Sequence, residues 1–144
     1  MNQETQISNP IGITDLEQYF TRYGWFADRI DNTSIQTGFS EANLLLPLVV
    51  QIDEDYIYFR MGLFPGATLD QDTNYSRLMQ LNDSAPIVKL SVGQSNELVA
   101  SIEYLVAQMN YDLFETTVGM LTDFVRSFYE EIVAAVRLIE ASGA

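Results

Sequence analysis

Two adjacent segments of the chain, Asn43–Ile52 and Tyr56–Leu63, most restrict what it can fold into. In the second segment, every odd position is apolar, whereas the even positions include tyrosine, arginine and glycine. Successive side chains of a β-strand point to opposite faces, so this alternation predicts a strand with one buried face. The acidic residues between the two segments, at positions 53–55, predict a polar turn. The sequence therefore predicts an antiparallel hairpin whose apolar face must be covered by another layer.

Three further segments have the pattern of β-strands. Ser34–Phe39 precedes the hairpin, and Ile87–Val92 and Glu97–Val106 follow it, the last two with apolar residues at alternate positions. Residues 93–96 join these two segments as a short turn, which predicts a second hairpin. Because hairpins connect antiparallel strands, the sheet is predicted to be antiparallel.

Helices are predicted before, between and after these strands. The first covers residues 14–23, where Thr14 and Glu17 have the spacing of a capping box. A short second helix is expected at 73–82. From residue 112 to about residue 141, apolar residues recur every three or four positions, which predicts a long final helix. At 1.5 Å per residue this helix would be about 45 Å long, so its C-terminal part is expected to project or to pack on another chain.

Together these elements predict an α+β fold of order α-β-β-β-α-β-β-α, in which helices pack on one antiparallel sheet. The length of 144 residues favours a single domain with one core. Residues 1–13 are mostly polar and contain Pro10 and Gly12. We expect them to form a flexible arm, and residues 14–144 to form the domain.

The composition limits the chemistry that is available. The chain contains neither cysteine nor histidine, so thiol nucleophiles, disulfides and imidazole bases or metal ligands are missing. The chain has seven basic and twenty acidic residues, for a formal net charge of −13. Such a charge repels polyphosphates and anionic lipids, so we expect no nucleic acid and no membrane partner. The N-terminal residues lack the features of a signal peptide, which favours a cytoplasmic location.

Residues 69–83 contain carboxylate and amide oxygens at alternate positions, Asp70, Asp72 and Asn74. This spacing matches the first ligands of a calcium loop. A loop of the EF-hand type also needs glycine at its sixth position and glutamate at its twelfth. Counted from Asp70, those positions hold tyrosine and leucine. No metal site is therefore expected, and Asp72 or Thr73 is instead predicted to cap the helix that follows.

Two surfaces are candidates for partner binding. Both faces of the run Leu44–Val50 are apolar, so both need cover. Either helices and loops of the same chain cover them, or one face meets a second subunit or a client segment through Leu44 or Leu46. The second candidate is the outer face of the sheet, because tyrosine and arginine are enriched at binding surfaces. A plain solvated face is the alternative there. Its residues are Tyr58, Arg60, Lys89, Ser101 and Glu103.

One stretch, residues 75–130, also resembles a known family. Leu78–Asn82 ends the middle helix with a leucine and an asparagine, and a strand, a turn, a strand and a long helix follow. Upstream, Phe20–Phe26 ends the first helix with tyrosine, glycine and an aromatic residue. These features resemble the YbjN family, whose members share the fold of class I type III secretion chaperones. The resemblance covers residues 14–138 and implies a cytosolic, acidic homodimer that binds proteins and has no catalytic residues to transfer.

The sequence thus favours a non-catalytic protein-binding module, a chaperone-like or regulatory homodimer with a protein client or partner. No catalytic residue, cofactor or metal ligand is assigned. The alternative is a small-molecule-binding or enzymatic α+β domain that uses carboxylates. A large cleft between sheet and helix, with buried and convergent carboxylates, would distinguish this alternative.

Overall fold

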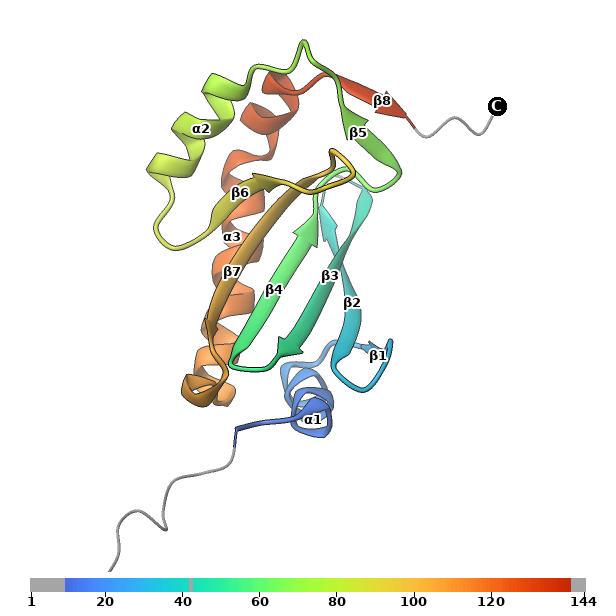
Figure 1. The fold of residues 1–144 in the computed structure, drawn as a ribbon, viewed down its shortest axis with the longest axis vertical. Coiled ribbons are helices and arrows are strands. Elements are labelled where there is room, and N and C mark those ends of the chain that lie inside the picture. Colours follow the sequence, from blue (N-terminus) through green and yellow to red (C-terminus); the bar gives the residue numbers. More distant parts are fainter. Residues whose placement is uncertain (1–9, 42, 141–144) are drawn as a thin grey trace, which may run out of the picture.

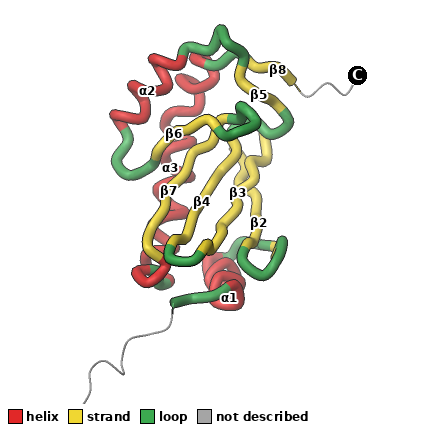
Figure 2. The backbone as a smooth tube through the Cα atoms, in the orientation of Figure 1, coloured by secondary structure: helices red, strands yellow, loops and turns green. Residues whose placement is uncertain are grey.

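The computed structural model describes residues 10–41 and 43–140 (Figure 1). Most of the predicted N-terminal arm, residues 1–9, lies outside the described residues. A six-stranded antiparallel sheet forms the middle of the molecule, and the long helix α3 runs along its inner face (Figure 2). A second sheet of two short strands lies beside one end of α3. The predicted α+β class and the antiparallel sheet are therefore confirmed.

The order of the strands in the main sheet is β1-β2-β3-β4-β7-β6. Both predicted hairpins are present, and the pairing of β4 with β7 joins them into one sheet. The sequence did not predict β1, which contains only two residues. The strands are β1 Asp28–Arg29, β2 Ser34–Glu41, β3 Leu44–Asp53, β4 Tyr56–Gly62, β6 Lys89–Val92 and β7 Leu98–Leu105.

The inner face of the sheet carries the core, as the alternation predicts. Ile57, Phe59 and Met61 of β4 are fully buried. Helix α3, Tyr111–Ala135, covers them with its own apolar stripe, and the ring of Phe114 lies 5.9 Å from that of Phe59. Each such buried side chain contributes about 1.5–3 kcal/mol to folding. The hydrophobic core therefore accounts for the position of α3 against the sheet.

The first helix, α1 Ile13–Tyr23, begins slightly earlier than predicted, and Thr14 is not its cap. The N-cap is Gly12, whose backbone N–H donates to Oδ2 of Asp15 over 2.8 Å. A cap must have an extended backbone before the first helical turn, and Gly12 has this conformation. Thr14 already lies inside the helix.

The middle helix, α2 Tyr75–Ser84, is capped by Asn74 and not by Asp72 or Thr73. Oδ1 of Asn74 accepts a hydrogen bond of 3.0 Å from the Arg77 N–H. The predicted type of interaction is present, but it belongs to a neighbouring residue, since the side chain of Thr73 has another partner.

The final helix is shorter than predicted. It ends at Ala135, and the strand β8, Leu138–Glu140, then pairs with β5, Ala67–Leu69. With 25 residues, α3 is about 37 Å long and its C-terminal part does not project. No helix in the described part of the chain is long and apolar enough to cross a membrane. The strand β7 also ends earlier than predicted, because residues 106–108 form a short 3-10 turn.

Hydrogen bonds from residues 70–74 determine where α3 ends. The N–H of Asn74 donates to the Ala135 carbonyl, and the N–H of Asp70 donates to the Arg137 carbonyl, both over 2.7 Å. Oγ1 of Thr73 accepts from the Arg137 N–H (3.0 Å) and donates to the Arg137 carbonyl (3.1 Å). We call this set of contacts the C-terminal clasp. It satisfies backbone groups that a helix end otherwise leaves free.

Candidate protein-binding site

The apolar run of β3 divides between the two faces of the sheet. Leu46 is fully buried in the core, so its side chain offers no surface to a partner. Leu44, at the start of the strand, is 45% exposed, and Leu45 on the outer face is 67% exposed. The same chain therefore covers the inner face of the run from Leu46 onward, and the outer face remains partly open. A role of Leu44 in binding stays a prediction.

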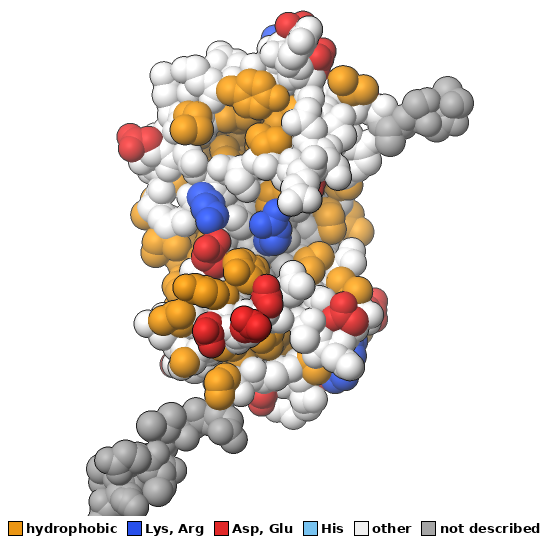
Figure 3. Space-filling view, in the orientation of Figure 1, with side chains coloured by type: hydrophobic (Ala, Val, Ile, Leu, Met, Phe, Trp, Pro, Cys, Tyr) orange, Lys and Arg blue, Asp and Glu red, His pale blue; other side chains and the backbone are white. Residues whose placement is uncertain are grey.

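The second predicted surface is brought together on the outer face of the sheet. Strand register places Tyr58 opposite Glu103 and places Ser101 between Arg60 and Lys89. Nζ of Lys89 forms an ion pair of 2.7 Å with Oε1 of Glu103. Ser101 is not solvated as expected, because only 2% of its surface is exposed. Basic side chains lie over the middle of this face, with acidic and hydrophobic side chains around them (Figure 3).

The sequence did not single out the edge strand β2, whose edge is partly open. β1 pairs only with Ile35 and Gln36, so within the described residues no strand continues beside Thr37–Glu41. Unpaired strand edges present N–H and C=O groups that accept a further strand.

The direction of these groups follows from the existing hydrogen bonds. The Ser34 carbonyl accepts from the Ile30 N–H on the β1 side, over 2.8 Å. Alternate residues of a strand direct their backbone groups to the same side. Gly38 and Ser40 therefore direct their N–H and C=O groups to the open edge.

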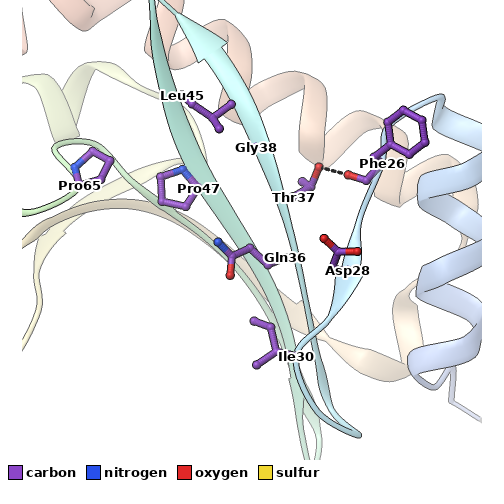
Figure 4. Close-up of a pocket in the computed structure, with 9 residues that line it drawn as sticks. All are labelled: Phe26, Asp28, Ile30, Gln36, Thr37, Gly38, Leu45, Pro47 and Pro65. Atoms are coloured by element: carbon purple, nitrogen blue, oxygen red, sulfur yellow. Dashed lines mark hydrogen bonds between the residues drawn. The ribbon is translucent and has the colours of Figure 1, made fainter.

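Apolar grooves lie on both sides of this edge. The outer groove has a volume of about 530 Å³, and Ile30, Leu45 and Pro47 contribute to its walls (Figure 4). The second groove, of about 540 Å³, opens toward α3 and includes Trp25 and Phe39. Phe26, Thr37, Gly38 and Leu45 line both grooves. We call this combined surface the β2-edge site.

Phe26 is the most unusual residue of the β2-edge site. Its side chain is 99% exposed, which is rare for a phenylalanine in a folded chain with no binding role. Its backbone is nevertheless fixed, because Oγ1 of Thr37 donates to the Phe26 carbonyl (Figure 4). The neighbouring Trp25 stacks on Phe39 at a centroid distance of 6.1 Å. The site therefore presents an exposed ring from a well-anchored segment.

Gly38 gives the outer groove its shape. A Cβ at this position would lie only 2.7 Å from Cδ1 of Leu45. The absence of a side chain on Gly38 thus allows Leu45 to lie over β2 and to form the groove wall.

Polar contacts of Asp31 and Arg29 fix the short β1 segment at the rim of the site. Asp31 accepts hydrogen bonds from Oγ of Ser34 (2.7 Å) and from the Thr33 N–H (2.9 Å). The bond from Ser34 contributes most, and that from Thr33 next, to a pKa of Asp31 below its ordinary value. Arg29 of β1 pairs with Glu17 of α1 over 2.8 Å, and this hydrogen bond lowers the pKa of Glu17. Both carboxylates are therefore charged at neutral pH, and the turn and α1 restrain β1.

At the opposite edge of the sheet, β6, a side chain of the same chain occupies the backbone groups of Leu90. Oδ1 of Asn82 accepts from the Leu90 N–H over 2.7 Å, and Nδ2 of Asn82 donates to the Leu90 carbonyl over 3.3 Å. The side chain of Asn82 thus takes the place of a neighbouring strand at Leu90. Around this edge lies a hydrophobic surface, the α2–β6 patch, formed by the exposed side chains of Tyr75, Met79, Ile87 and Val92.

The carboxylates of the described residues do not converge in a cleft. None of their Asp or Glu side chains belongs to the buried set, and no group of three is placed to hold a metal ion. The grooves of the β2-edge site contain Asp28 as their single carboxylate. The acidic stretch at 70–74 instead uses its backbone in the C-terminal clasp.

No protein-family model and no curated protein sequence matches the chain, so the resemblance to the YbjN family stays a prediction. Solved structures do match. The chaperone chain of the ExsC–ExsE complex aligns with a TM-score of 0.61 and 13% identity, over 92% of this chain and 97% of that one. The chaperone of the HopA1–SchA chaperone–effector complex aligns with a TM-score of 0.59 and 12% identity, over 81% and 91%.

A third match comes from the heterodimeric ExoU–SpcU complex of the type III secretion system of Pseudomonas aeruginosa. The TM-score is 0.54 at 16% identity, and the alignment covers 85% of this chain and 98% of the other. At such identities the likeness concerns the fold alone. The chain has the α+β fold of the type III secretion chaperones.

Proposed function

We propose that the chain is a non-catalytic protein-binding module, chaperone-like or regulatory, that takes an extended segment of a partner protein onto the β2-edge site. The open backbone edge at Gly38 and Ser40, set between two apolar grooves, carries this proposal. An added strand needs backbone partners along its length and pockets for its side chains on alternate faces. The β2-edge site offers both.

The two edges of the sheet differ in a way that supports this choice. At β6, the Asn82 side chain occupies the backbone groups of Leu90. At β2, the described residues leave the corresponding groups of Gly38 and Ser40 open. Proteins normally protect edge strands against pairing with other chains. An edge that is left open beside a fully exposed Phe26 therefore favours a binding role.

The similar structures support a protein partner. They are chaperones in complexes with other proteins, in one case described as a chaperone–effector complex. The net charge of −13 further favours a partner segment that is basic or apolar rather than strongly acidic overall.

The proposal includes a homodimer in the cytoplasm, of the kind that the YbjN resemblance implies. The α2–β6 patch is the surface that we assign to it. Met79 is 66% exposed and Ile87 is 59% exposed, and a small groove of about 140 Å³ runs between α2 and β6 beside Met79. Since Asn82 occupies the backbone groups of Leu90 in the middle of β6, the two copies would associate through side chains and not through a continuous sheet.

The alternative function, a carboxylate-based enzyme or small-molecule site, has no specific support. Acid–base catalysis by carboxylates needs a pair of them facing one reacting group. The grooves of the β2-edge site contain one carboxylate between them.

Amide hydrogen exchange tests the proposal directly. Peptides are selected on the purified protein from a display library, and exchange is then measured with and without the selected peptide. We expect slower exchange at Gly38 and Ser40, because a paired strand would bind their N–H groups. Exchange at Leu90, which is already bonded to Asn82, should not change.

A pair of variants adds a second readout. Phe26→Ser should weaken peptide binding about tenfold or more, as expected for an aromatic anchor. Leu105→Ser is the matched control, since Leu105 is 44% exposed and lies outside both grooves. Equal losses in the two variants, or protection confined to α2 and β6, would reject the β2-edge site.

A further inference from the structure

Three residues form a row across the outer face of the sheet. Arg60 of β4 and Lys89 of β6 both lie opposite Ser101 of β7, which is the strand between them. Directly opposed residues of an antiparallel pair have Cβ atoms about 4.5–5.5 Å apart. The two cationic side chains therefore flank one serine on the same face of the sheet. We call these residues the basic row.

Ser101 is an unusual member of this row. It is only 2% exposed, and its Oγ is buried with no hydrogen-bond partner in the structure. Buried hydroxyl groups are normally bonded, because an unsatisfied one costs folding free energy. An unsatisfied hydroxyl between two cations points to a ligand that accepts hydrogen bonds.

Arg60 is equally unusual among the basic residues. The chain has twenty acidic residues for seven basic ones, yet within the described residues Arg60 has no ion pair, ring contact or side-chain hydrogen bond. The other basic side chains pair with Glu17, Glu131, Glu103 and Asp123, stack on Tyr111, or donate to backbone carbonyls. The guanidinium of Arg60 thus keeps its donors available.

The third member, Lys89, is held in place by one ion pair and keeps other hydrogen-bond donors available. Its Nζ bonds to Oε1 of Glu103 over 2.7 Å. An ammonium group has three donors, so this ion pair leaves two of them. Glu103 therefore fixes the position of the ammonium but also weakens its attraction for a further anion.

We propose that the basic row binds a carboxylate, supplied by an Asp or Glu side chain of the partner protein. The planar guanidinium of Arg60 matches a carboxylate with two parallel hydrogen bonds. The Ser101 hydroxyl, buried in the free protein, donates a third once the carboxylate displaces the side chains that cover it. The inference rests on the proposed function, since the carboxylate belongs to the partner segment at the β2-edge site. A carboxylate is favoured over a phosphate because the net charge of −13 opposes a group of higher negative charge.

The distances across the sheet allow one partner to reach both places. β4 lies two strands from β2, which is about 10 Å at the usual spacing between strands. An extended chain covers this distance with about three residues. A partner segment that leaves the β2 edge over the outer face therefore brings an acidic side chain to Arg60.

Titration with acetate tests the site without any partner. Acetate, inorganic phosphate and chloride are added at matched ionic strength, and NMR follows the Nε–Hε signal of Arg60 and the backbone amide of Ser101. We expect saturable shifts of both signals with acetate and none with chloride. Shifts that follow ionic strength alone, or that saturate with phosphate and not with acetate, would overturn the proposal.

Variants give a signature that a structural role would not produce. Arg60→Gln should abolish the saturable shift at Ser101, and Ser101→Ala should weaken acetate binding about threefold to tenfold. Glu103→Gln should strengthen it, because the competing carboxylate is removed. Arg22→Gln is the control, since Arg22 lies over the Tyr111 ring, outside the basic row.

Weaker binding in Glu103→Gln, or equal effects of Arg60→Gln and Arg22→Gln, would reject the basic row as a site. Arg60 is exposed, so its variant keeps the test valid if Ser101→Ala folds poorly.

Selected peptides connect the site to the partner. Changing their acidic residues to amides should weaken binding to the unmodified protein and leave binding to the Arg60→Gln variant unchanged. The same loss with both proteins would overturn the assignment of the carboxylate to the partner. Protection of Gly38 and Ser40 is a separate measurement, so failure of the basic row and failure of the β2-edge site give different results.

Discussion

The side chain of Asn82 takes the place of a neighbouring strand at the edge of the sheet. Its amide both accepts from and donates to the backbone of Leu90, as a neighbouring strand would. An amide is the side chain that offers a donor and an acceptor in this arrangement. The asparagine at the end of the middle helix thus has a structural role at the sheet edge.

Replacement of Asn82 tests this role. Asn82→Ala should lower the free energy of unfolding by about 1–3 kcal/mol, because it leaves the N–H and carbonyl of Leu90 without partners. Asn82→Asp should have a smaller effect, since a carboxylate still accepts from the N–H. Urea unfolding measures both, with Asp83→Ala, an exposed neighbour, as the control. A loss for Asn82→Ala no larger than that of Asp83→Ala would contradict this assignment.

Helix caps show what the sequence predicts at the scale of residues. The sequence placed a cap at the start of each of the first two helices, and each cap is one or two residues away from the predicted position. Several residues near a helix start have suitable side chains. Which of them caps depends on tertiary contacts, and Thr73 is unavailable because it bonds to Arg137.

Elements with a regular pattern were predicted well, and short elements were not. The alternation in β4 identified the strand and its buried face, because burial imposes the period of two. In β7 it identified the strand and its inner face, although residues 98–102 are buried on both faces. The strands β1, β5 and β8 have two or three residues, too few to show a period. The end of α3 was missed for another reason. Apolar residues continue beyond Ala135 at helical spacing, and the clasp that stops the helix comes from residues 70–74.

The start of α1 supplies a prediction for a whole element. Asp15→Ala should destabilise the protein by about 0.5–1 kcal/mol, since it removes the bond from the Gly12 N–H and a negative charge in the first turn. Thr14→Ala should change the free energy of unfolding by only a few tenths of a kcal/mol, because Thr14 has no capping role in the structure. Thermal unfolding of the two variants compares them. A larger loss of stability for Thr14→Ala than for Asp15→Ala would instead support Thr14 as the N-cap.

For the whole molecule, surface sites were the hardest to predict. The sequence correctly predicted that Tyr58, Arg60, Lys89 and Glu103 share one face of the sheet. Strand parity and the order of the hairpins determine that face. It did not identify Phe26, since an isolated aromatic residue after a helix looks like a core residue. Its 99% exposure depends on where β1 ends and on how α1 packs, and both are tertiary properties.

The proposed homodimer gives a prediction at this scale. Met79→Asp should yield a folded monomer, because Met79 lines the groove between α2 and β6 and its 66% exposure makes it dispensable for the core. Ser76→Asp, on an exposed part of the same helix, should leave the dimer intact. Light scattering after size-exclusion chromatography measures the mass. A monomeric unmodified protein, or a dimeric Met79→Asp variant, would contradict the proposal.

The C-terminal clasp has a consequence for how the protein is made. Asp70 and Thr73 bond to Arg137, and β5 pairs with β8. In each case the partner lies more than sixty residues later in the chain. A ribosome releases the chain from its N-terminus onward, so these partners meet only after the end of α3 has left the exit tunnel. Until then the nascent chain exposes the β5 segment and the start of α2. The contacts of Arg137 and of β8 thus form late in synthesis.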